Sequence, residues 1–476
     1  MKKAFLTITL IATPLMSFSQ ENKAVATGNN PLLTSYSTPY EVPPFHLIKN
    51  EHFKPAILEA IRIHDGEIKA IAESKAAPTF ENTIVAMENA GTLLNRVNTV
   101  FSNLNGANTN DDLQRIAKEV APEQSKHLDN IFLNEKLYAR VKKVWDEQKK
   151  YNLNGEQARM LERKYKAFLR SGANLDAKGK ERLREINKEL SVLSLKYGEN
   201  VLAENNAYQL VIDKKEDLAG LPADLISAAA DEAKAKGKPG KWVFTLHNAS
   251  VMPFLQYADN RELRRQIWTA YQKRGNNGGA TDNKAGAVQM ANLRNEKARL
   301  LGYKNHAAFV LEERMAQTPE KAYALLDQLW KPALAKAKAE EADIKKLMAA
   351  DGIKGDVQPY DWRYYTEKIR RQRYALDEEE LKPYFSLENV RNGIFKVTEN
   401  LYGLQYRQLK DVPKYHEDVT VWEVTEKDGK HIGLLYMDMH PRESKKGGCL
   451  DDIIPQAADE RWQACSAGYL NRMQLL

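Results

Sequence analysis

Val419-Thr-Val-Trp-Glu-Val-Thr425 and Ile432-Gly-Leu-Leu-Tyr-Met-Asp-Met439 carry the clearest structural signal in this chain of 476 residues. The first stretch alternates apolar and polar side chains, which is typical of a half-buried strand, and the second is the returning strand. Asp428-Gly429 lies between them and favours a type I′ turn. The pattern predicts an antiparallel hairpin, and we expect its neighbouring strands to be missing. A polar exit follows, Met439-His-Pro-Arg-Glu-Ser-Lys-Lys-Gly-Gly448.

Residues 449–476, which come after this exit, differ in character from the rest of the chain. Both cysteines, Cys449 and Cys465, fall within them, whereas residues 1–448 contain none. A body without cysteine is not held together by disulfides and must be stabilised by its core. Because this segment alone carries a residue type excluded elsewhere, the composition predicts a different origin for it.

Upstream of the hairpin, the hydrophobic period becomes that of a helix. Apolar residues recur at spacings of three, four and seven through residues 79–104, which predicts one helix of about seven turns that Thr79 caps. Further helices are predicted at 111–132, 137–150, 155–171, 176–206, 221–235, 260–275, 285–301, 306–315, 319–350, 360–374 and 387–401. Residues 208–213 and 241–247 alternate instead. The predicted fold class is mainly α, with two small antiparallel β elements.

The first residues have the pattern of an export signal. Lys2 and Lys3 precede an apolar run that is too short to span a bilayer and is interrupted by Pro14. Small side chains at Ser17 and Ser19 suit cleavage before Gln20. We therefore predict a signal peptide over residues 1–19, a periplasmic or secreted location, and no membrane span after its removal. The proline-rich segment 20–52 is predicted to be an extended N-terminal arm.

The charge of the chain does not favour a nucleic-acid partner. Lysine and arginine number 71 and aspartate and glutamate 64, a formal excess of +7 that is spread over the sequence. Nucleic-acid binding would require a clustered basic face. One aromatic and basic cluster, Trp362, Tyr364, Tyr365 and Tyr374 beside Arg370, Arg371 and Arg373, could stack single-stranded bases. Its helical spacing favours core packing with a basic outer face.

The sequence contains no complete catalytic motif. No two of its nine histidines are three or four residues apart, so no helix face carries the imidazole pair of a zinc peptidase, and H-E-x-x-H is absent. Asp438 and His440 lie two apart on a strand, where a carboxylate could orient an imidazole. The alternative, a polar pair at a strand end on the surface, is favoured because short matches are often accidental. We therefore predict no catalytic, cofactor-binding or metal-ligating residue in the chain.

Several stretches together resemble the M3 family of zinc metallopeptidases, most closely its peptidyl-dipeptidase branch. They occur in the family's order: Pro78-Thr-Phe-Glu-Asn-Thr-Ile84, Arg261-Glu-Leu-Arg-Arg265, Leu300-Leu-Gly-Tyr303, Met315-Ala316 with Thr318-Pro319, Tyr384-Phe385, and residues 436–448. The resemblance implies a neurolysin-like architecture, a helical two-lobed body around a channel that admits short peptides, and we expect a monomer. It further implies a helical body over residues 53–412 and the start of the catalytic domain over 413–448.

In this family, the zinc ligands lie in H-E-x-x-H and a later glutamate, and the glutamate of the motif activates water. None of these positions exists in the chain, so the resemblance implies an incomplete zincin core and, for this chain, no zinc. Codons for residues 449–476 can be chosen so that omitting their first base gives AWMTSYRKQRMNGGKRVAPVISIVCNF, the sequence expected of the family at this place. We therefore interpret residues 449–476 as a frameshifted tail.

Two hypotheses follow. The first is that the chain is the truncated and inactive front portion of an exported peptidyl-dipeptidase or oligopeptidase that cleaves short peptides. The second is that it is a non-catalytic helical protein that binds peptides or a protein partner.

Overall fold

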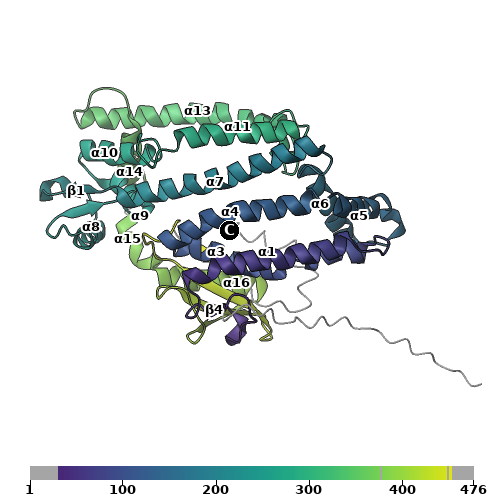
Figure 1. Cartoon of the computed structure of the whole chain (residues 1–476). Coiled ribbons are helices and arrows are strands. Elements are labelled where there is room, and N and C mark those ends of the chain that lie inside the picture. Colours follow the sequence, from purple (N-terminus) through teal and green to yellow (C-terminus); the bar gives the residue numbers. More distant parts are fainter. Residues whose placement is uncertain (1–29, 376–377, 447–449, 453–476) are drawn as a thin grey trace, which may run out of the picture.

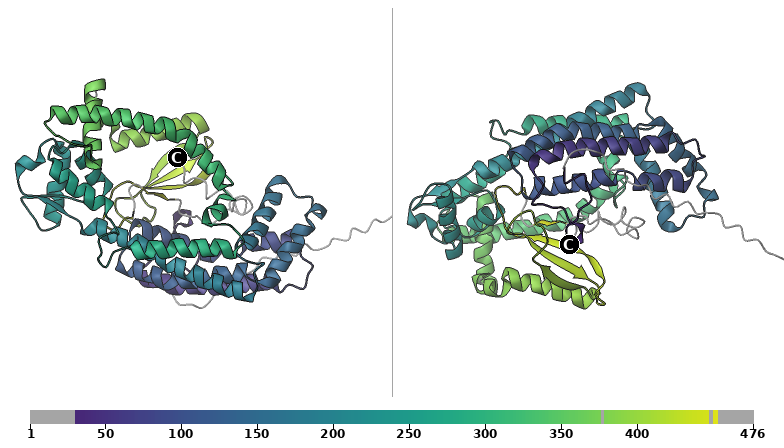
Figure 2. Two further views of the ribbon diagram at one scale, coloured as in Figure 1. Left: turned by 90° about the horizontal axis from the view of Figure 1, so that it is seen from above. Right: turned by 60° about the horizontal axis from the view of Figure 1, so that its bottom comes forward.

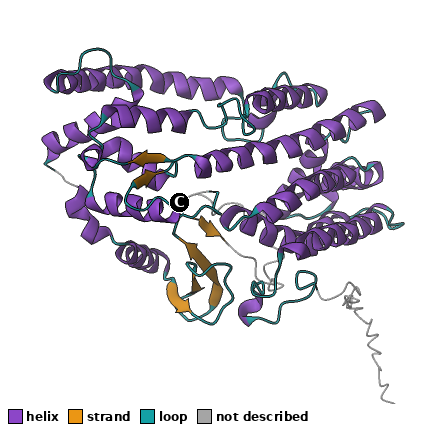
Figure 3. Cartoon of the chain, turned by 60° about the vertical axis from the view of Figure 1, so that its left-hand side comes forward, coloured by secondary structure: helices purple, strands orange, loops and turns teal. Residues whose placement is uncertain are grey.

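The structure is a computed structural model that describes residues 30–375, 378–446 and 450–452, and it consists mostly of long helices (Figure 1). Two small antiparallel sheets interrupt them, which confirms the predicted fold class (Figure 3). Among the described helices, none is both long and apolar enough to cross a membrane. The predicted signal peptide and most of the predicted frameshifted tail lie outside the described residues.

The central layer consists of α1 (Asn50–Ala72), α3 (Thr92–Ala107), α4 (Asp111–Phe132) and α7 (Ala177–Ala207). α1 contacts α3 and α4, and α4 contacts α7, which in turn contacts α11 (Lys284–Leu300). The side chains of Asn110 and Asp176 accept hydrogen bonds from the first turns of α4 and α7, so both helices begin where their caps indicate. The core between them is apolar and includes Phe53, Ile57, Val97, Phe101, Leu113 and Val120.

The predicted single helix over residues 79–104 is wrong. Thr79 does cap its start, but the segment forms a π-helical turn, Phe80–Val85, then the short α2 (Ala86–Asn89), and α3 begins only at Thr92. Between them, Gly91 has a φ of +77°, and a Cβ there would lie 2.6 Å from the ring of His64. The chain turns at Gly91 because only glycine allows this conformation so close to the imidazole.

A second core lies beneath the smaller sheet. β1 (Leu210–Ile212) and β2 (Trp242–Phe244) pair antiparallel, as their alternation predicts. α8 (Ala223–Ala235), α9 (Asn248–Tyr257) and α10 (Arg261–Gln272) complete this unit. α5 (Glu135–Asp146) and α6 (Gly155–Arg170) form a third core together with the Phe80–Val85 turn.

The helices after α11 are less tightly packed. α12 (His306–Leu311) leads to α13 (Pro319–Ala350), which packs on α14 (Pro359–Tyr374) through Ile344 and Met348. α15 (Glu378–Leu381) and α16 (Leu387–Tyr402) follow. In the view from above in Figure 2, α13 and α16 (green and yellow-green) lie on the side of the molecule opposite α1 and α4.

The larger sheet has the strand order β3 (Gln405–Leu409), β4 (Thr420–Thr425), β5 (His431–Asp438) and β6 (Leu450–Asp452), all antiparallel. The β4–β5 hairpin is confirmed, but the expectation that its neighbouring strands are missing is wrong, because β3 and β6 flank it. β3 also lies within residues 53–412, which the sequence assigned to a helical body. The expected type I′ turn is wrong as well. Glu426 and Lys430 close a three-residue loop in which Gly429 has a φ of +88° and Asp428 has a negative one.

Of the arm predicted over residues 20–52, the structure describes residues 30–52, and these contribute side chains to the core. Leu32 packs among the central helices, and Val42 packs against Val419, Val421 and Tyr436 of the sheet. The arm therefore fastens the sheet to the helices.

Candidate functional site

The exit of β5 carries a group of buried charges at the boundary between the larger sheet and the helices. Asp438, the last residue of the strand, is fully buried. Its carboxylate accepts hydrogen bonds from Tyr415 Oη at 2.9 Å and from both terminal nitrogens of Arg442 at 2.9 and 2.5 Å. Lys445 Nζ, also buried, lies 3.2 Å from the same carboxylate and donates to the Asp438 carbonyl at 2.6 Å.

These contacts keep Asp438 ionised in the interior. Burial alone would raise the pKa of this carboxyl, but the hydrogen bonds from Arg442, Tyr415 and Lys445 lower it below its usual value. Two cations surround one carboxylate, so the cluster of Asp438, Arg442 and Lys445 carries a formal excess of positive charge. Such a cluster fixes the direction of the chain that leaves the strand.

The exit segment after β5 is bound to the helices by its main chain. Thr109 N donates to Ser444 O at 2.8 Å, and Lys446 N donates to Gly106 O at 2.9 Å. Arg442 Nη2 donates to Ala107 O at 2.7 Å, which links the charge cluster to the end of α3. Asn206 Nδ2 at the end of α7 donates to Glu443 O at 3.1 Å. The segment thus joins three elements that are far apart in the sequence.

The structure does not support a catalytic pair of Asp438 and His440. The Asp438 carboxylate bonds to Tyr415, Arg442 and Lys445, whereas the His440 side chain is exposed and its carbonyl accepts from Lys445 at 3.2 Å. The favoured alternative is wrong in one respect, because Asp438 lies in the interior and not at the surface. Arg442 and Lys445 were not predicted from the sequence as partners of Asp438. Their spacing of four and seven residues from Asp438 was the available signal.

Two histidines that are distant in the sequence meet between α1 and α4. His127 Nδ1 lies 2.7 Å from Asp65 Oδ1, and His127 Nε2 lies 2.9 Å from His64 Nδ1. Burial, and then the neighbouring imidazole, lower the pKa of His64 to about 4. A search by local spacing cannot find this pair, because 63 residues separate its members. Within the described part of the chain, no three His, Cys, Asp or Glu side chains are grouped to hold a metal ion. That this chain binds no zinc stays a prediction.

The aromatic side chains of the α14 cluster mostly pack in the core, which is the interpretation that their helical spacing favoured. Tyr364 and Tyr365 are buried against Ile344 and Met348, and Trp362 packs beside them. Arg370 and Arg371 pair with Glu367. Tyr374 alone among the four aromatic residues is largely exposed.

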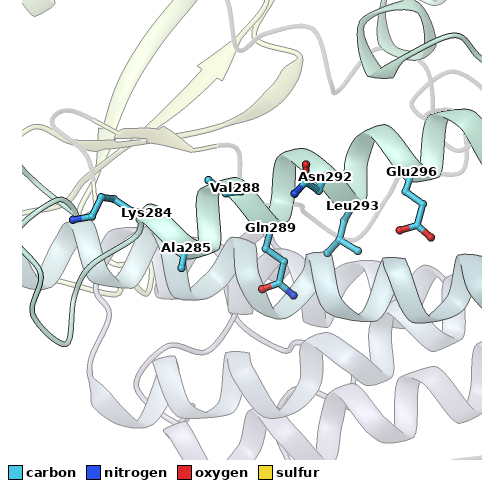
Figure 4. A pocket seen from close by; sticks show the side chains of 7 residues that line it. All are labelled: Lys284, Ala285, Val288, Gln289, Asn292, Leu293 and Glu296. Atoms are coloured by element: carbon cyan, nitrogen blue, oxygen red, sulfur yellow. The ribbon is translucent and has the colours of Figure 1, made fainter.

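Open hollows lie on the surface of the described part of the chain, and two of them are of similar size. One, of about 540 Å³, runs along one side of α11 and is lined by Lys284, Ala285, Val288, Gln289, Asn292, Leu293 and Glu296 (Figure 4). The other, of about 550 Å³, lies over β3 and β4 beside Arg407 and Glu423. The glycine-rich loop 276–283 leads into α11. It is bound by Glu204, whose carboxylate accepts from Gly275 N at 2.7 Å and from Thr281 Oγ1 at 2.7 Å.

Comparison with known proteins shows which family this chain resembles. Residues 254–470 match the family model described as Peptidase family M3. The chain is 37% identical over 424 residues to a dipeptidyl carboxypeptidase of Salmonella typhimurium, and this alignment covers 88% of this chain and 62% of that protein. It is 35% identical to a dipeptidyl carboxypeptidase of Escherichia coli over 89% of this chain and 62% of that protein. It is 31% identical to oligopeptidase A of Escherichia coli over 90% and 63%, respectively.

The chain therefore spans a little over three fifths of the length of these curated relatives. The matched part includes the central helices, the helices around the smaller sheet, and the exit of β5. Dipeptidyl carboxypeptidases and oligopeptidase A match about nine tenths of this chain, and the family model matches residues 254–470. The chain therefore belongs to peptidase family M3.

Proposed function

We propose that this chain is the front portion of an exported zinc peptidase that acts on short peptides, and that it has no peptidase activity by itself. The observation that carries the proposal is the 37% identity over 424 residues to a dipeptidyl carboxypeptidase. The M3 family is a family of zinc metallopeptidases, and the relatives are a dipeptidyl carboxypeptidase and oligopeptidase A. The zinc motif of the family, H-E-x-x-H, does not occur in the 476 residues.

The residues present do not fit a zinc ion. In the part of the chain that the structure describes, no three possible ligands are placed to hold one metal ion, and the buried carboxylate at the exit of β5 is occupied by Arg442 and Lys445. We therefore derive no catalytic step in this chain. The proposed role of its residues is to build the helical lobe and to fix the direction of the segment that leaves β5.

Restoring the reading frame tests this proposal. The unrepaired 476-residue chain and a version with one base removed at the Gly448–Cys449 junction are purified with the same tag and incubated with short unstructured peptides and with a folded protein. The repaired protein should cleave the peptides, lose this activity with a chelator, and leave the folded protein intact. The unrepaired chain should show no turnover.

A matched control variant distinguishes hydrolysis by the repaired protein from hydrolysis by a contaminating peptidase. In the repaired protein, the glutamate of the restored H-E-x-x-H is replaced by glutamine, and the variant should retain zinc but lose hydrolysis. Chelator-sensitive cleavage by the unrepaired chain after a second purification would contradict the proposal, as would a repaired protein that does not cleave peptides.

Export is proposed on the pattern of residues 1–19 alone. Expression of the full chain in a Gram-negative bacterium should yield a periplasmic protein that begins at Gln20, and intact-mass measurement of that fraction checks this. The variant Lys2→Glu with Lys3→Glu should slow the processing. A mature protein that retains residues 1–19 in the cytoplasm would contradict export.

A further inference from the structure

The histidine pair His64 and His127 lies where two apolar cores meet. On α1, the core of the central layer extends to Ile61, and the third core, which α5 and α6 share, begins at Ile68. On α4, residues 121–130 separate the same two cores, and His127 is one of them. In Figure 1, α5 and α6 lie at the right-hand end of the molecule, beyond this boundary. The pair therefore joins α1 to α4 at the place where one core gives way to the other.

A single hydrogen links the two imidazoles. An ionised carboxylate only accepts hydrogen bonds, so His127 Nδ1, which lies 2.7 Å from Asp65 Oδ1, is the donor in that contact. His127 Nε2 and His64 Nδ1 lie 2.9 Å apart, which leaves room for one hydrogen between them. The rings can share this hydrogen while both are neutral or while one is charged. If both were protonated, two N–H groups would face each other and the hydrogen bond would be lost.

The charged groups around His64 come from several elements. Asp65 is its neighbour on α1 and favours a charge on the pair. Lys164 of α6 disfavours a charge on His64, and Lys164 itself pairs with Glu88 of α2 at 2.5 Å. Burial of His64, followed by the nearby His127 and then by Lys164, lowers its pKa to about 4, although Asp65 opposes this shift. An imidazole in water takes up the same proton at about pH 6.5.

The turn at Gly91 encloses the His64 ring on another side. Gly91 N donates to Glu67 Oε2 at 2.7 Å, which binds the turn to α1 three residues after His64. A Cβ at Gly91 would lie 2.6 Å from the ring, so the backbone of the turn already packs against it. The ring therefore has little room to rotate towards the turn. Separation of α1 from α4 is the direct way to relieve two facing charges.

We propose that the pair of His64 and His127 is an acid-sensitive latch that holds the third core, with α5 and α6, against the central layer. This proposal does not depend on peptidase activity. The closed latch excludes the second proton, whereas the opened latch accepts it. Opening therefore becomes more favourable as the pH falls from about 6.5 towards about 4, and the latch stays closed above this range. The expected result is a local separation of the third core in mild acid while the central layer stays folded.

Hydrogen exchange of the full chain, measured by mass spectrometry and corrected for the effect of pH on the intrinsic rate, tests the latch. Between pH 6 and pH 4, protection of α5 and α6 in the parent should fall at least about tenfold, and that of α3 far less. His64→Asn retains a donor for His127 Nε2 but cannot take up the proton, so the additional loss in α5 and α6 should disappear. His46→Asn, which replaces an exposed histidine, is the matched control and should respond as the parent does.

Three results of this experiment would overturn the proposal. They are an equal acid response of His64→Asn and the parent, an equal loss of protection in the third core and the central layer of the parent, and no loss in the parent at all. If His64→Asn does not fold at pH 7, nitrogen NMR of the histidine rings in the parent decides. The two rings are identified by the coupling across their shared hydrogen bond. A latch requires one of them to stay neutral to below about pH 5, whereas independent titration of both at about pH 6.5 would contradict it.

Discussion

At the scale of single residues, the interior charge cluster of Asp438, Arg442 and Lys445 decides how β5 continues. The Asp438 carboxylate is fully buried and is contacted by three donor side chains, those of Tyr415, Arg442 and Lys445. A buried ion pair adds little net stability compared with apolar residues. Removing one partner nevertheless lowers the stability strongly, because it leaves the other charge buried without a partner.

Arg442→Met should therefore lower the free energy of unfolding by about 3 kcal/mol, since Asp438 loses its two-pronged partner and Ala107 O loses a donor. Urea denaturation at pH 7 measures this. Arg115→Met is the matched control, because Arg115 forms exposed pairs with Asp112 and Glu119 whose loss should change the stability far less. Equal effects of the two variants would contradict the cluster's role.

The same cluster predicts a pH dependence. The pKa of Asp438 is lowered in the folded chain, so its contribution to stability is present above the unfolded value of about 3.9 and is lost as the pH falls through the lower folded value. The difference in unfolding free energy between the parent and Asp438→Asn should thus shrink between pH 5 and pH 3, roughly the window set by that shift. A difference that stays constant over this range would contradict an ionised Asp438.

Gly91 and Gly106, at opposite ends of α3, form a natural pair for comparison. Gly91→Ala should destabilise the protein by more than about 1 kcal/mol, because φ is +77° and the new Cβ would meet the His64 ring at 2.6 Å. Gly106→Ala, in a helix with open space around it, should be neutral or stabilise by up to about 1 kcal/mol. Thermal unfolding of both variants checks the opposite signs.

At the scale of elements, the N-terminal arm holds the larger sheet against the helices. Val42 is fully buried among Val419, Val421 and Tyr436, and Val42→Ala should cost about 1–3 kcal/mol. Hydrogen exchange of the β4 and β5 amides should accelerate in this variant while that of α4 stays slow. Val288→Ala, at an exposed position of α11, should change neither. Protection of β4 and β5 that is unaffected by Val42→Ala would contradict the arm's role.

Elements with a regular period could be predicted from the sequence, and elements that depend on distant contacts could not. α4 over 111–132 and α13 over 319–350 begin and end at the predicted residues because their caps and stripes are local. β3 escaped prediction because this edge strand is largely exposed and shows no regular alternation of burial. The break at Gly91 depends on His64, and the surroundings of Asp438 depend on Tyr415 and on the end of α3. Neither follows from local spacing.

At the scale of the whole molecule, we expect the chain to bind no zinc. The 476-residue protein, dialysed after purification, should contain well under one zinc per chain by metal analysis, because no histidine pair in it has ligand spacing. The repaired protein should contain one. One zinc per unrepaired chain would reveal a site assembled across the fold, and it would contradict the prediction.

The most direct test of the central claim, that this chain is the front portion of an M3 peptidase whose frame shifts after Gly448, is the nucleotide sequence of its gene. With one base omitted at the codon of Cys449, we expect the frame to stay open, to read Ala-Trp-Met, to continue to Cys-Asn-Phe, and then to encode H-E-x-x-H. A downstream sequence with stop codons in that frame, or an open frame without the zinc motif, would contradict it.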